Sequence, residues 1–108
     1  MPVTDDTALL RARGRMALVL PGWDSFSVWG WDDREGCLFA QLWRDDDDGS
    51  AGPRIWITTL AGWPAFTAPE DLAEAIASAT GCPMHAALLA LADQAPGYLG
   101  PYLRALAA

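Results

Sequence analysis

Cysteine and histidine are the side chains best suited to hold zinc or to pair a nucleophile with its base, and this chain has two Cys and one His. Cys82 and His85 stand near the start of an expected helix, whereas Cys37 lies on an expected strand. A tetrahedral zinc site would still need an Asp or Glu ligand, and no paired-ligand spacing is present. We therefore expect no metal site and interpret both cysteines as structural.

Sequence motifs for catalysis and for cofactor binding are absent. Any Ser-His-Asp or Cys-His arrangement would have to include His85, and no G-x-S-x-G elbow occurs. The phosphate-binding patterns G-x-G-x-x-G and G-x-x-x-x-G-K-[ST] are missing as well. We therefore expect a protein that is not an enzyme, with no catalytic residue and no cofactor.

The carboxylate run Asp45–Asp48, followed by Gly49, invites comparison with a calcium-binding loop. With Gly49 at the sixth position, an EF-hand would need a carboxylate at Arg44 and a bidentate Glu at Ile55. Neither residue can serve, and unspaced like charges repel one another. We interpret this run as a solvated loop.

The charge balance is strongly acidic: seven Arg, no Lys and fourteen carboxylates give a formal net charge of −7. This excess keeps an aromatic-rich chain in solution and repels the phosphate backbone, so we expect no direct nucleic-acid binding. The same charge suits an alternative function, an acidic inhibitor of the immunity type or a nucleic-acid mimic that binds a basic partner. Its contact residues would be Asp32, Asp33, Glu35, Asp45, Asp46, Asp47 and Asp48.

A single domain accounts for residues 1–108, because this length supports one hydrophobic core. Residues 1–14 are expected to form a flexible arm or a short helix. Two cysteines are too few for a disulfide-stapled secreted fold, so we expect a cytoplasmic protein. The first apolar run, Met16–Leu20, is too short for a signal or membrane-spanning segment, so we expect no membrane contact.

The order of elements predicts an α+β fold, with an antiparallel sheet of three or four strands over about residues 16–60. The expected strands are Met16–Leu20, Phe26–Trp31, Cys37–Trp43 and Arg54–Leu60. Two or three C-terminal helices should pack on one face of this sheet. Residues 67–81 and 83–95 have helical spacing with Pro and Gly at their ends, and a short third helix is expected from Pro101.

The acidic turn that ends at Gly36 sets the register of the central hairpin. Pairing Trp31 with Cys37 divides the hairpin into two faces, because successive strand residues point to opposite sides. The aliphatic face then holds Phe26, Val28, Gly30, Leu38, Ala40 and Leu42, and the aromatic face holds Ser27, Trp29, Trp31, Cys37, Phe39, Gln41 and Trp43. The Ala- and Leu-rich helices are expected to cover the aliphatic face.

The chain has six Trp, and the aromatic face carries several of them. An uncovered aromatic face is typical of an interaction site, where Trp is enriched. We therefore expect a non-enzymatic protein-interaction or regulatory module. Its expected partner is a second copy of the chain, in a homodimer, or another protein. The expected binding residues are Trp29, Trp31, Phe39, Gln41, Trp43 and Trp56. A second alternative is a small-molecule binder with a Trp-lined pocket.

Overall fold

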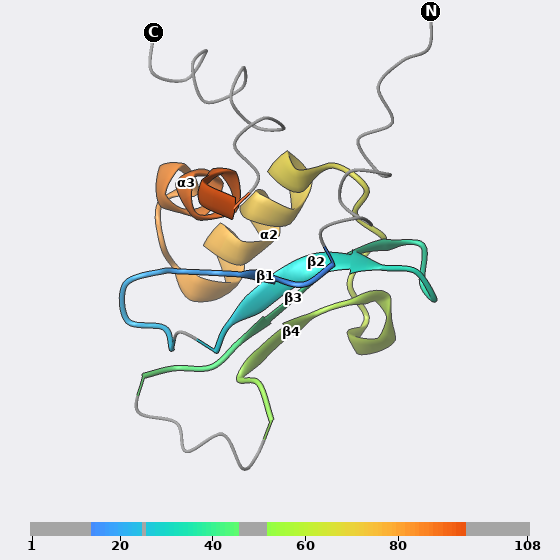
Figure 1. Ribbon diagram of the computed structural model, residues 1–108, viewed down its shortest axis with the longest axis horizontal. Helices are drawn as coiled ribbons and strands as arrows, with labels where there is room; N and C mark the ends of the chain where they lie inside the picture. Colours follow the sequence, from blue (N-terminus) through green and yellow to red (C-terminus); the bar gives the residue numbers. More distant parts are fainter. Residues whose placement is uncertain (1–13, 25, 46–51, 95–108) are drawn as a thin grey trace, which may run out of the picture.

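The computed structural model describes residues 14–24, 26–45 and 52–94, and confirms the expected α+β fold (Figure 1). A four-stranded antiparallel sheet in the order β1-β2-β3-β4 precedes two helices. The elements are β1 (Met16–Ala17), β2 (Val28–Asp32), β3 (Cys37–Leu42), β4 (Ile55–Ile57), the 3₁₀ helix η1 (Thr59–Ala61), α2 (Pro69–Thr80) and α3 (Met84–Gln94). The expected N-terminal arm, Asp46–Asp48 and the expected helix from Pro101 lie outside the described residues.

The two outer strands are shorter than their sequence patterns indicate. In β1 the ladder extends only one bond further, from the Leu18 N–H to the Ser27 carbonyl at 2.8 Å, before Pro21 and Gly22 turn the chain. Gly22 has a φ of 84°, which glycine adopts at little cost. β4 ends at Ile57 because the Thr58 hydroxyl caps η1, accepting a hydrogen bond from the Leu60 N–H.

The turn between β2 and β3 is held by the side chain of Asp32. Its Oδ1 atom accepts hydrogen bonds from the N–H groups of Arg34 at 2.9 Å and Glu35 at 3.3 Å. The Gly36 N–H donates to the Asp32 carbonyl at 2.8 Å, and Gly36 takes the left-handed conformation with a φ of 65°. Gly36 therefore ends the turn as predicted, but Asp32 belongs to the strand.

The expected register of this hairpin is wrong by one residue. Asp32, rather than Trp31, pairs with Cys37, and Trp29 pairs with Ala40 rather than Phe39. The shift arises because the Asx-type bonds of Asp32 leave a loop of only 33–36. A shift of one residue moves every side chain of β2 to the opposite face, so the expected aliphatic and aromatic faces are both incorrect.

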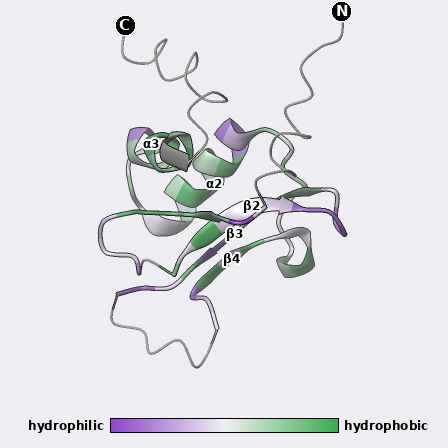
Figure 2. Ribbon diagram, viewed as in Figure 1, coloured by the Kyte–Doolittle hydropathy of each residue, from purple (hydrophilic) through white to green (hydrophobic). Residues whose placement is uncertain are grey.

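The core lies between the sheet and the two helices, which sit together on one face (Figure 1). Trp29 shares this helix-covered face with the β3 side chains of Leu38 and Ala40, and is fully buried. The helices contribute Leu72, Ala73, Ala75, Ile76, Ala87, Leu88, Ala90, Leu91 and Ala92. In Figure 2 the hydrophobic colour lies on much of β3 and of the helices, whereas the turn between β2 and β3 is hydrophilic.

The ends of α2 follow the expected capping pattern. Pro69 occupies the first turn with Glu70 and Asp71, where carboxylates oppose the positive end of the helix dipole. Gly81 ends the helix with a φ of 79°, and its N–H donates to the Ala77 carbonyl. Among the described helices, neither is long and apolar enough to cross a lipid bilayer.

Candidate binding surface

The residues best suited to chemistry are dispersed over the fold. Cys37 is buried on β3, Cys82 is half-buried between the two helices, and His85 is exposed on α3. Both cysteines are free thiols. Within residues 14–24, 26–45 and 52–94, no group of three His, Cys, Asp or Glu side chains gathers where it could hold a metal ion.

The environment of Cys37 disfavours the thiolate form of its side chain. Burial raises the pKa of the Cys37 thiol above its ordinary value of 9.0, and the carboxylates of Asp32 and Glu35 raise the pKa further. Hydrogen bonding to Thr59 opposes this shift in part. Because the thiolate is the nucleophilic form, this arrangement suits a structural cysteine.

The acidic residues of the expected inhibitor surface are divided between structural and exposed positions. Asp32 supports the β2–β3 turn, and the Glu35 carboxylate accepts a 2.7 Å hydrogen bond from the Thr59 hydroxyl. Asp33 and Asp45 are exposed. The remaining members, Asp46, Asp47 and Asp48, lie outside the described residues.

The expected aromatic binding face is only partly assembled. Trp29 is wholly buried on the helix-covered face, and Trp31, paired with Leu38 on that same face, packs against the core. Trp43 lies beyond the end of β3, where its backbone N–H donates to the Ser27 hydroxyl at 3.1 Å. Trp29 is therefore part of the core and has no surface with which to bind a partner.

The other sheet face is turned away from both helices, and we call it the helix-free face. By register it holds Val28, Gly30, Asp32, Cys37, Phe39, Gln41 and Trp56. Trp56 pairs with Gln41 across β3 and β4, and 43% of its side chain is exposed. Three of the six expected binding residues thus share a face, although with different neighbours from those that the predicted register gave them.

A hollow of about 330 Å³ lies mainly on this face, and its lining also includes Trp31, which by register belongs to the helix-covered face. Aromatic, amide and charged residues border it: Gly14, Arg15, Trp31, Asp32, Asp33, Phe39, Gln41 and Trp56. This volume is near the lower limit for small-molecule pockets, which span roughly 300–1,000 Å³. Cys, His, Ser and Thr are missing from these lining residues, so the hollow offers surfaces for stacking and charge pairing.

Arg15 and Gly30, which the sequence pattern does not indicate as site residues, shape this hollow. The Arg15 guanidinium lies over the Phe39 ring at 5.5 Å from its centroid, a cation–π arrangement. Arg15 reaches this position because the preceding residue crosses close above Gly30: a Cβ atom on Gly30 would lie 2.6 Å from the Gly14 carbonyl oxygen. A glycine inside a strand is the sequence signal for such a close backbone approach.

Neither a protein family, nor a curated protein, nor a solved structure matches this chain.

Proposed function

We propose that the protein is a non-enzymatic interaction module that forms a two-fold homodimer through its helix-free face. The observation that carries the proposal is the exposed indole of Trp56, which stands on a sheet face beside a hollow containing Phe39 and Gln41. Large aromatic side chains at such positions are typical anchors of protein interfaces. A second copy would bury both indoles at once.

The charges around the hollow favour a second copy over other partners. A two-fold interface brings the same patch of both subunits together, so the patch must complement itself. Here Arg15 supplies a positive charge and Asp33 a negative charge on the border of the same hollow, and both side chains are exposed. In a two-fold pair, Arg15 of each copy can face Asp33 of the other.

The first experiment measures the dimer dissociation constant of the full chain and of Trp56→Ser by sedimentation equilibrium. Both subunits of the dimer lose their indole, so at about 2 kcal/mol for each anchor the loss of about 4 kcal/mol weakens association by roughly 1,000-fold. The matched control is Leu60→Ser, because Leu60 is 69% exposed on η1 and does not line the hollow. We expect the control to dimerise like the wild-type chain.

A charge exchange tests the two-fold arrangement itself. Arg15→Asp and Asp33→Arg should each weaken the dimer, because each places like charges opposite one another. The double variant should restore association, since every pair is then reversed in sign. A wild-type chain that stays monomeric at about 100 µM, a concentration well above a micromolar dissociation constant, would refute the homodimer.

We also propose that the protein works in the reducing cytoplasm. Cys37 and Cys82 are both unpaired thiols, and disulfides are the rule only in oxidising compartments. Fractionation of host cells with an antibody to the chain tests this assignment. Recovery in a membrane or extracellular fraction would contradict it.

A further inference from the structure

A second hollow, of about 350 Å³, lies between α2 and the segment that joins η1 to α2. Its described lining residues are aromatic, acidic or small: Trp63, Pro64, Phe66, Asp71, Glu74, Ala75 and Ser78. None of them lines the hollow that borders the helix-free face, so the two hollows are separate.

One wall of this second hollow is a single face of α2. Asp71, Glu74, Ala75 and Ser78 stand at positions i, i+3, i+4 and i+7, which lie on the same side of a helix. Ala75 is buried, whereas Asp71 and Glu74 are exposed and form no ion pair with any other described residue. The helix therefore presents two carboxylates beside an apolar floor.

The other wall is aromatic and is held by backbone hydrogen bonds. The Phe66 carbonyl accepts a hydrogen bond from the Leu38 N–H of β3 at 2.7 Å, and the Trp63 N–H donates to the Thr58 carbonyl at 3.2 Å. The two rings have centroids 6.4 Å apart and planes inclined at 52°. Both side chains pack on the core and are half-buried, so each keeps part of its ring surface accessible. The rings are thus positioned in advance of any ligand.

Aromatic rings beside carboxylates suit an organic cation. A ring face attracts a cation that lies within about 6 Å of its centroid, and Asp71 and Glu74 add formal negative charge. Among the described lining residues none is basic, and the net charge of −7 attracts cations at longer range. A primary ammonium is strongly hydrated and needs several hydrogen-bond acceptors, whereas a quaternary ammonium offers methyl groups that contact ring faces.

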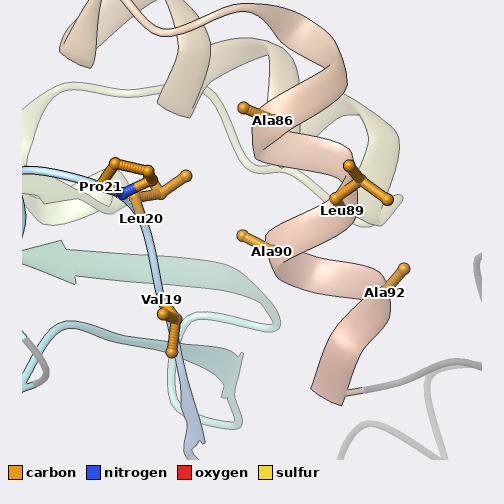
Figure 3. Close-up of a pocket in the computed structure, with 7 residues that line it drawn as sticks. All are labelled: Val19, Leu20, Pro21, Ala86, Leu89, Ala90 and Ala92. Carbon is orange, nitrogen blue, oxygen red and sulfur yellow. The ribbon is translucent and has the colours of Figure 1, made fainter.

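The larger groove drawn in Figure 3 lacks this combination of groups. It has a volume of about 620 Å³ and lies between α3 and the chain that follows β1. Its described lining residues are all apolar: Val19, Leu20, Pro21, Ala86, Leu89, Ala90 and Ala92. This groove can receive apolar surface but has no described side chain that would select a charged ligand over a neutral one.

We propose that the hollow between α2 and residues 63–66 binds a quaternary ammonium group. The rings of Trp63 and Phe66 contact its methyl groups, and the carboxylates of Asp71 and Glu74 balance its charge. This site does not depend on the homodimer, because it shares no lining residue with the proposed interface.

The first test titrates the full chain with choline and with the neutral tert-butyl analogue of choline, in which carbon replaces the charged nitrogen. Amide chemical shifts followed by NMR locate and quantify binding. We expect choline to saturate with a dissociation constant of about 1 mM or lower, to shift residues of this hollow, and to bind at least about tenfold more tightly than the analogue. Equal binding of the two ligands, no choline binding up to about 10 mM, or shifts confined to the groove of Figure 3 would each overturn the proposal.

Charge substitutions on α2 give a matched pair of variants. Glu74→Gln should weaken choline binding by about two- to fivefold, the usual range for an exposed charge pair. Glu70→Gln removes the same charge from the same helix, but Glu70 does not line the hollow, so its affinity should equal that of the wild type. Equal weakening in both variants would mean that only long-range charge attracts choline, and would refute the site.

Ring substitutions test the aromatic wall. Trp63→Leu should lower the preference for choline over its neutral analogue by at least about threefold, because the cation loses a ring face. Trp63→Phe keeps a ring and should retain most of this preference. An unchanged preference in a folded Trp63→Leu chain would contradict the proposal.

Peptides distinguish the two sources of the ligand, because a trimethylated lysine side chain carries the same group as choline. Binding of a trimethyllysine peptide at least about tenfold more tightly than choline would assign the site to a modified protein, and weaker binding would assign it to a free molecule. A peptide with unmodified lysine should bind less tightly than its trimethylated form. Equal binding of the two peptides would overturn the selection of a quaternary group.

Discussion

At the scale of single residues, Trp29 and Trp56 show how position decides the role of one residue type. Trp29 is wholly buried among core residues, whereas Trp56 is 43% exposed on the helix-free face. We predict that Trp29→Ala lowers the free energy of unfolding by about 3–5 kcal/mol, the usual loss for a buried aromatic side chain. Trp56→Ala should change the stability of the monomer by less than about 1 kcal/mol.

Urea denaturation of both variants at a concentration where the chain is monomeric checks this prediction. Leu38→Ala is the positive control, because Leu38 shares the helix-covered face with Trp29 and should cost about 2–5 kcal/mol. Equal destabilisation by the two Trp substitutions would contradict the assignment of Trp56 to an interface.

The thiol of Cys37 predicts a specific loss of stability in alkali. Burial raises the pKa of this thiol above 9.0 in the folded chain, so the unfolded chain loses the proton first as the pH rises. The contribution of Cys37 to stability is therefore complete below about pH 9 and falls as the pH increases toward the folded pKa. In Cys37→Ala the free energy of unfolding should therefore fall less steeply with increasing pH than in the wild type.

The measurement is the free energy of unfolding between about pH 7 and about pH 10 for the wild type and the variant. Cys82→Ala, which keeps Cys37, should retain the decline. Parallel pH profiles for the wild type and Cys37→Ala would show that the buried thiol does not contribute.

At the scale of elements, Gly30 determines how the start of the chain crosses the sheet. A Cβ at this position would lie 2.6 Å from the Gly14 carbonyl oxygen, a backbone atom that cannot rotate away. We predict that Gly30→Ala displaces residues 14 and 15, weakens the β1 pairing and lowers stability by about 1–3 kcal/mol.

Hydrogen exchange of the β1 amide groups checks this effect, together with thermal unfolding. Val28→Ala is a suitable control, because Val28 lies on the same strand and face and is only half-buried. This substitution shortens a side chain and adds no atom that could clash with the crossing segment. Unchanged exchange in Gly30→Ala would mean that the crossing segment adapts without cost.

The helices and the class of fold could be predicted from the sequence because their signals are local. Pro69 and Gly81 bound α2 through fixed backbone preferences, and the helical spacing of Leu72 and Ile76 selects the buried side. Such signals do not depend on distant contacts. The predicted ends therefore agree with the structure to within a few residues.

The hairpin register could not be predicted, because it depends on a choice at one residue. Asp32 is compatible with either the loop or the strand, and its side-chain hydrogen bonds to Arg34 and Glu35 decide in favour of the strand. With Asp32 in the strand, Trp29 lies in the core. Phe39, Gln41 and Trp56 lie together on the other face, so three of the six expected binding residues share one face, with cross-strand partners that differ from the predicted ones.

At the scale of the whole molecule, the net charge of −7 predicts how dimerisation depends on salt. Two copies repel each other over distances comparable to the Debye length, about 10 Å at 0.1 M salt and about 3 Å at 1 M. We therefore predict that the homodimer becomes tighter as the salt concentration rises. A complex with a basic partner would become weaker over the same range.

Sedimentation equilibrium at several NaCl concentrations shows whether the dimer becomes tighter or weaker as the salt concentration rises. The double variant Arg15→Asp/Asp33→Arg has the same net charge as the wild type and should show the same trend. A wild-type dimer that dissociates as salt is added would mean that charge pairing outweighs the aromatic contact.

The shortness of the outer strands has a consequence for behaviour at high concentration. An exposed strand edge offers unpaired N–H and C=O groups that can add strands from other molecules. In the described sheet the outer strands are only Met16–Ala17 and Ile55–Ile57, so each outer strand presents few such groups in line. The helix-free face can in this way stay exposed while the outer strands give fibrils little template on which to grow.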